Sequence, residues 1–318
     1  MKILMVFITA LLGGFIVVKL MFFTPQKTYK IDTTDVSHFW QAYDSLKQVH
    51  SYADSVKILQ SVYLDRMTAY GEKYIKGRKY TVAEYIKTLE KYPRYFVQLK
   101  KKTAQIQAHK NEIDSAFKKL NQSIPDYNMP DVCFAIGCFR GGGTITKNKD
   151  AVLVGCEIAL ADSTMDISEF TGTLRRMFSH AGGSVSFLVA HESIHCQQWN
   201  GQNNTLLSIA LAEGTADFLA NEILDAHVDN INSYGITHEC ELWHEFKPQI
   251  YSTDVSQWFY NTSLTETRPA DLGYFVGRRI CEAYYNKQAN KKEAIKFLLN
   301  RGNYLQVFKK SCYNGNCN

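Results

Sequence analysis

Apolar side chains recur every three to four positions over the first third of the chain. Between about residues 35 and 121, Phe39, Tyr43 and Leu46 form one such set. This spacing places apolar side chains on one face of a helix. The segment 81–84 reads Thr-Val-Ala-Glu, a capping-box pattern that starts a helix. We therefore predict an N-terminal helical segment over residues 26–125.

Two short runs in the middle of the chain have the composition of β-strands. They cover residues 131–139 and 151–155, on either side of a glycine turn at 141–143. The proline-containing stretch 123–130 separates them from the helical segment. Two interpretations stay open: the sheet edge binds an extended substrate through main-chain hydrogen bonds, or the strands form an ordinary structural hairpin.

The helical spacing returns after these strands. Gly182-Gly183-Ser184 supplies a turn and an N-cap for a helix that ends near residue 200, and a second apolar pattern predicts a helix from Leu206 to Leu224. The fold class that follows is α+β and mainly helical, with a small sheet beside a helix that carries the sequence His-Glu-Ser-Ile-His.

That sequence provides candidate metal ligands. His191 and His195 are four residues apart and share one helix face, so both imidazoles can bind one zinc ion. Glu213 is the candidate third ligand, and Asp217, one turn further on, can accept a hydrogen bond from a ligand histidine. Glu192 is the candidate general base. In the simpler alternatives, the two histidines are merely polar residues on a helix face, and the helix that carries Glu213 and Asp217 is an ordinary core helix.

A later predicted helix offers a hydrogen-bond donor for hydrolysis at the metal site. Hydrolysis requires a donor that stabilises the developing oxyanion, and Tyr274 or Arg278 could face the site. We take Tyr274 as the candidate catalytic residue. Core packing for Tyr274 and a surface ion pair for Arg278 are the simpler interpretations, and the case for Arg268 is weaker.

These motifs carry a family resemblance. His191-Glu192-x-x-His195 with Glu213-Gly214-x-Ala216-Asp217, after Gly141-Gly142-Gly143-Thr144, resembles the bacterial predicted zinc-dependent proteases, to which gliding-motility-associated lipoproteins are also similar. The resemblance covers about residues 39–284. It implies a zincin-like core of the gluzincin class, in which the downstream glutamate is the third zinc ligand and the aspartate supports a ligand histidine.

The chain departs from the lipoprotein relatives in one respect. Those relatives carry an export signal that ends in a cysteine, whereas the first cysteine here is Cys133. The resemblance therefore gives no support for lipid anchoring, or for a role in motility.

The N-terminus and the cysteines indicate the compartment. Residues 3–23 are apolar apart from Lys19, about the length of a membrane span, and favour an uncleaved anchor over a cleaved signal peptide. We expect membrane contact through this N-terminal segment, residues 1–25. An even number of cysteines, 8, is compatible with disulfides in an exported chain, and Cys312 and Cys317 could close the C-terminal tail.

Composition and charge set limits on the function. The 318 residues are 45% hydrophobic, which suits a globular protein, and the net charge of +5 comes without a nucleic-acid-binding motif. We predict no nucleic-acid partner, and the sequence leaves the oligomeric state open. His238 and His244 are six residues apart, on opposite helix faces, so they do not repeat the zinc motif.

The leading hypothesis is a zinc metallopeptidase of the cell envelope, with its catalytic domain at residues 126–318 and a peptide or protein as substrate. The alternative is a non-catalytic envelope protein, similar to the gliding-motility proteins, that keeps a structural metal site. The intact Glu192 argues against this alternative, because structural zinc sites fill all four positions with protein ligands.

Overall fold

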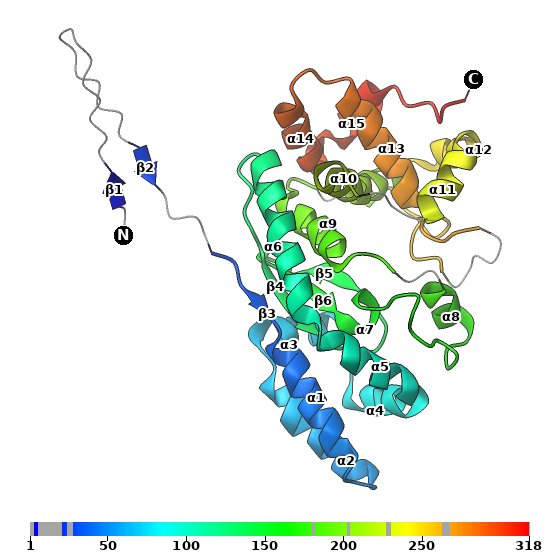
Figure 1. The fold of residues 1–318 in the computed structure, drawn as a ribbon. Coiled ribbons are helices and arrows are strands. Elements are labelled where there is room, and N and C mark those ends of the chain that lie inside the picture. The colour runs from blue at the N-terminus through cyan, green and yellow to red at the C-terminus, as the bar shows by residue number, and fades with distance from the viewer. Residues whose placement is uncertain are drawn as a thin grey trace.

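The computed structural model describes residues 3–5, 21–23, 28–179, 182–201, 204–226, 230–262 and 268–317. Helices surround one small sheet (Figure 1), which confirms the predicted α+β, mainly helical class. Buried side chains from the helices and the sheet form one hydrophobic core.

The central sheet has four strands in the order β3-β4-β6-β5. They are β3 (Ile31–Asp32), β4 (Asp131–Ala135), β5 (Gly143–Ile145) and β6 (Ala151–Gly155). β4 runs parallel to both β3 and β6, whereas β5 lies antiparallel to β6 at the edge of the sheet. Every residue of β6 is buried, as expected for a strand covered on both faces.

The two predicted strands exist, but they do not form a hairpin. They are parallel neighbours, and the segment between them contributes a further strand, β5. The first strand ends at Ala135 instead of residue 139. The backbone N–H groups of Gly137 and Phe139 donate to the buried carboxylate of Glu157, at 2.8 and 3.2 Å, and so leave the sheet pattern.

Six helices form the predicted N-terminal helical segment. They are α1 (Thr34–Leu46), α2 (Tyr52–Ile58), α3 (Ala69–Arg78), α4 (Val82–Lys91), α5 (Pro93–Thr103) and α6 (Ile106–Ser123), with η1 (Leu59–Tyr63) and η2 (Leu64–Arg66) between α2 and α3. The predicted cap at Thr81 is present, since its side chain accepts a hydrogen bond from the N–H of Glu84. Tyr63 and Tyr85 both donate to the carbonyl of Ile136, which fixes these helices to the end of β4.

The C-terminal half is helical after the sheet. Its elements are α7 (Cys156–Ala159), α8 (Gly172–Phe178), α9 (Val185–Gln197), α10 (Leu206–Leu224), α11 (Asn230–Thr237), α12 (Glu239–Phe246), η3 (Lys247–Gln249), α13 (Leu272–Asn286), α14 (Lys291–Leu299), η4 (Arg301–Asn303) and α15 (Tyr304–Ser311). The bounds of α10 confirm the predicted helix. α9 packs between the sheet and the helices α6 and α10 (Figure 1).

The prediction for the N-terminal segment is wrong. Ile3–Met5 and Met21–Phe23 form two short antiparallel strands, β1 and β2, and the residues between them, 6–20, lie outside the described part. Within the part that is described, no helix has both the length and the apolar character to cross a bilayer. This finding contradicts the expected membrane contact through this segment.

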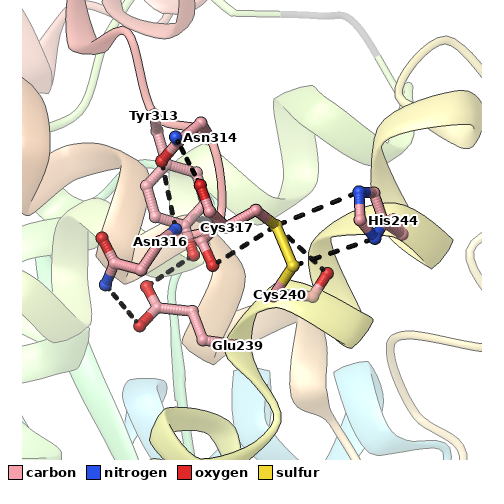
Figure 2. Close-up of a disulfide and its surroundings, with 8 residues drawn as sticks. Glu239, Cys240, His244, Tyr313, Asn314, Asn316 and Cys317 are labelled. Atoms are coloured by element: carbon pink, nitrogen blue, oxygen red, sulfur yellow. Dashed lines mark hydrogen bonds between the residues drawn. A yellow bond between two sulfur atoms is a disulfide. The ribbon is translucent and has the colours of Figure 1, made fainter.

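A disulfide fixes the C-terminal tail, but it is not the one considered from the sequence. Cys317 is bonded to Cys240 of α12, and Cys312 is free and exposed. Figure 2 shows the tail lying along α12. Glu239, which is buried, accepts hydrogen bonds from Tyr313 and Asn316, each at 2.7 Å. The bridge therefore closes a loop between residues 77 apart in sequence, not a short terminal turn.

We expect the double substitution Cys240→Ser/Cys317→Ser to lower the free energy of unfolding by about 4 kcal/mol, because the open chain gains the conformational freedom of a long loop. Urea denaturation followed by circular dichroism measures the change. Cys312→Ser is the control and should have little effect. Equal stability of the double variant and the wild type would contradict this account of the tail.

A second prediction concerns the contact between α10 and α13. A Cβ atom built on Gly277 would lie 1.8 Å from the carbonyl oxygen of Ala210, and one on Gly214 would lie 2.1 Å from the backbone of Gly277. Gly277→Ala should therefore push the helices apart and destabilise the protein by about 2 kcal/mol. The control, Gly77→Ala in α3, meets no atom within 4 Å. Thermal unfolding should show no loss of stability for this control.

Candidate metal centre

The two motif histidines lie on α9, which begins where the sequence predicts. Ser184 is its N-cap, and the Ser184 hydroxyl accepts a hydrogen bond from the N–H of Phe187. One helical turn separates His191 from His195, and both rings face α10. His191 is buried, and His195 is partly buried.

Glu213 of α10 completes a three-residue cluster. Its Oε2 atom lies 3.1 Å from Nε2 of His195 and 3.4 Å from Nε2 of His191, and the two Nε2 atoms are 3.1 Å apart. Tetrahedral zinc, with bonds of about 2.0–2.1 Å, separates its ligand atoms by about 3.4 Å. The structure thus brings together the three predicted ligands at spacings that suit one zinc ion.

The second ring nitrogen of each histidine faces an acceptor. His195 Nδ1 is 3.0 Å from Oε1 of Gln198, whose amide Nε2 donates to the carbonyl of Ala212 at 2.7 Å. Because that donation fixes the amide, Oε1 accepts the Nδ1 proton of His195. The predicted partner Asp217 lies 3.7 Å from Nδ1 of His191. With acceptors facing both Nδ1 atoms, the Nε2 atoms are the ones left to bind a metal ion, as ligand tautomers require.

The pKa shifts show that this cluster favours a positive charge at its centre. Burial lowers the pKa of His191, but Asp217 and Glu213 more than offset it and raise the value to about 10. Burial raises the pKa of Glu213, but the two histidines hold it well below its usual range. A divalent cation would supply the positive charge between three electron-pair donors.

A pocket of about 310 Å³ opens beside the cluster. It is lined by Glu192, His195 and Glu213, by Tyr274 of α13, and by the edge strand β5. Glu192 lies against that strand, because a Cβ atom built on Gly143 would be 2.9 Å from its Oε1. The candidate base, two of the ligands and the sheet edge therefore share one pocket.

Tyr274 lies at this pocket with its ring centre 6.1 Å from that of His191. Burial, followed by the charge of Glu213, raises the pKa of its phenol well above the usual value, so the hydroxyl remains a donor at neutral pH. Arg278 is not among the residues that line the pocket. Arg268 forms an ion pair with Glu245 at 2.8 Å.

The other histidines lie elsewhere. His238 pairs with Glu241, His244 is next to the disulfide in Figure 2, and neither lines the pocket. His180 lies outside the described residues.

Several residues of the site were not found from the sequence. Gln198 stands just beyond the end of α9, and its place three residues after His195 was the only available signal. The others line the pocket from distant segments: Arg78, Lys149, Tyr260 and Arg301. No local pattern connects them, so only the fold identifies them.

Comparison with known families assigns the chain. The model of the family described as gliding motility protein GldB matches residues 25–315. The protein belongs to the GldB family. This result supports the resemblance to gliding-motility lipoproteins and a location in the cell envelope, whereas the comparison gave no zinc protease family. No curated protein and no solved structure matches the chain.

Zinc binding by this GldB-family protein can be tested on purified variants. His191→Ala and Glu213→Ala should each lose stoichiometric zinc, because each removes one of three ligands, while Glu192→Gln should keep it. Gln198→Leu should lower zinc affinity by about 10–100-fold, since the orientation of His195 is lost. Metal analysis and cobalt spectroscopy measure the metal content and the affinity of each variant. The control, His238→Ala, should bind like the wild type, and full zinc binding by His191→Ala would contradict the assignment.

Proposed function

We propose that this GldB-family protein is a zinc-dependent hydrolase of the cell envelope that acts on peptide bonds. The observation that carries the proposal is the convergence of three ligand atoms beside a pocket that also holds a carboxylate outside the ligand set, Glu192. Three protein ligands with an open side are typical of catalytic zinc sites, whereas structural sites have four protein ligands.

Each residue has a separable role in this proposal. A zinc ion held by His191, His195 and Glu213 would supply Lewis acidity and make water a better nucleophile. Glu192 would accept the proton of the attacking water and pass it to the leaving amine. Tyr274, protonated at neutral pH, would donate a hydrogen bond to the developing oxyanion.

The edge strand supplies a means of holding the substrate. Among the described strands, β5 pairs with β6 alone, and its Gly143 contacts Glu192. An extended peptide can add to such an edge through main-chain hydrogen bonds, which give affinity with little sequence preference. The substrate that this geometry suits is an extended peptide chain.

The disulfide supports an exported location for this part of the chain. Disulfides such as Cys240–Cys317 form and persist in oxidising compartments. We therefore place the proposed activity on the exported side of the envelope, periplasmic or extracellular.

The family membership favours a second candidate, a non-catalytic binding protein of the gliding apparatus in which the metal only stiffens the fold. The family description names gliding motility and no enzymatic activity, so it supports this candidate more than a peptidase. The pocket beside Glu192 supports the peptidase. Activity measurements separate the two.

We expect the zinc-loaded protein to cleave a casein-like substrate or a peptide library, and a chelator to abolish this cleavage. Glu192→Gln should retain zinc and lose about 10²–10⁴-fold in turnover, because the general base is removed. Cleavage is read by mass spectrometry, with metal content measured on the same samples. Absence of cleavage in a stoichiometrically zinc-loaded wild type would contradict the peptidase and favour the binding protein.

A further inference from the structure

The pocket beside the metal centre carries more positive than negative side chains. Arg78, Lys149 and Arg301 line it together with the carboxylates of Glu192 and Glu213. The carboxylate of Glu213 already pairs with His191 and His195. A bound divalent cation would increase the excess of positive charge further.

None of the three cations forms an ion pair with a carboxylate of the described residues. Lys149 Nζ donates to the backbone carbonyl of Gln198, which carries no formal charge. The Nε atom of Arg301 is buried and has no hydrogen-bond partner. Both side chains are partly buried, and a buried donor such as this Nε is costly unless an acceptor completes its site.

Both side chains are held close to the metal ligands. Arg301 begins η4, and its N–H donates to the carbonyl of Trp199 at 2.9 Å, which ties it to the segment that follows α9. Lys149 contacts Gln198, the residue that orients His195. Burial, followed by repulsion from Arg301, lowers the pKa of Lys149, so the two charges lie within electrostatic reach of each other.

The third cation has a different environment. Arg78 donates from Nη1 to the carbonyl of Arg140 and from Nη2 to that of Gly143, at 3.2 and 2.9 Å. These bonds hold the strand edge in place and engage both terminal nitrogens with backbone carbonyls, although the buried Nε of Arg78, like that of Arg301, has no hydrogen-bond partner. Arg78 is therefore a structural neighbour of the site, and Lys149 and Arg301 remain as the available donors.

We propose that Lys149 and Arg301 form a subsite for a carboxylate of the peptide that occupies this pocket. The proposal rests on the proposed function and adds the substrate class, which is a peptide with a negative charge close to the scissile bond. A guanidinium and an ammonium together provide charge-assisted hydrogen bonds for a carboxylate. The carboxylate belongs either to the C-terminal residue or to an acidic side chain.

The pocket volume limits how far this charge can lie from the reaction centre. The two cations and Glu192 line the same pocket of about 310 Å³. A carboxylate bound there is consequently on a residue next to the bond that would be cleaved.

Peptide binding tests the subsite without turnover. The zinc-loaded Glu192→Gln protein is titrated with three fluorescent hexapeptides of otherwise equal, neutral sequence: one with a free C-terminus, one amidated, and one amidated with an internal glutamate. We expect at least one anionic peptide to bind about tenfold more tightly than the neutral amide. The anionic peptide that binds better identifies the source of the carboxylate.

Variants separate the subsite from the attraction of the metal itself. Lys149→Gln and Arg301→Gln, each made in the Glu192→Gln background, should remove most of the preference while zinc content stays unchanged. The matched control is Lys147→Gln, which neutralises an exposed lysine two residues from Lys149 that does not line this pocket. This control should keep the full preference.

Equal affinity for the three peptides, or a preference that survives both substitutions, would overturn the subsite. Cleavage by the wild type is measured in parallel. Cleavage without an anionic preference refutes the subsite and leaves the proposed function standing. A preference without cleavage refutes the peptidase and leaves a carboxylate-binding site.

Discussion

The pairing of the partly buried Glu213 with two histidines is the interaction on which the rest of the site depends. A buried carboxylate costs several kcal/mol unless it is paired, and here His191 and His195 provide the pairing. The arrangement exists only because α10 lies directly against α9. That placement depends on α13, which approaches α10 so closely at Gly277 that no side chain fits there. The ligand geometry is therefore supported by a helix that supplies no ligand.

Two buried carboxylates, Glu157 and Asp35, hold the surroundings of the sheet in place. Glu157 accepts the N–H groups of Gly137 and Phe139, and in this way turns the chain away from β4 toward the edge strand. Asp35 is also fully buried and accepts from the N–H and hydroxyl of Thr68. Asp35 also accepts from the thiol of Cys133 in β4 at 3.5 Å, which connects the N-terminal helices with the sheet. The helical segment thus supports β5, the strand that lies against Glu192.

Membership of the GldB family and a metal-ligand cluster in one chain raise a question about what the cluster does. Both proposed functions use the same three ligands, and they differ in whether the open side of the site meets a substrate. The cations Lys149 and Arg301 bear on this question, because a purely structural metal would need no uncompensated positive charge beside it. Their position favours a site that receives a ligand.

The sequence alone determined the local features, because these depend on spacing within one helix or strand. Four-residue spacing placed His191 and His195 on one face, and apolar periodicity gave the bounds of α10, including Glu213. The β-strand composition identified β4 and β6, but not their parallel pairing, since composition does not encode which strands become neighbours. The tertiary structure decided which residues meet: Gln198 beside His195, Cys317 with Cys240, and Lys149 in the same pocket lining as Arg301. It also contradicted the expected membrane contact through the apolar N-terminal run, since no helix of the described residues could cross a bilayer and apolar length alone does not fix a conformation.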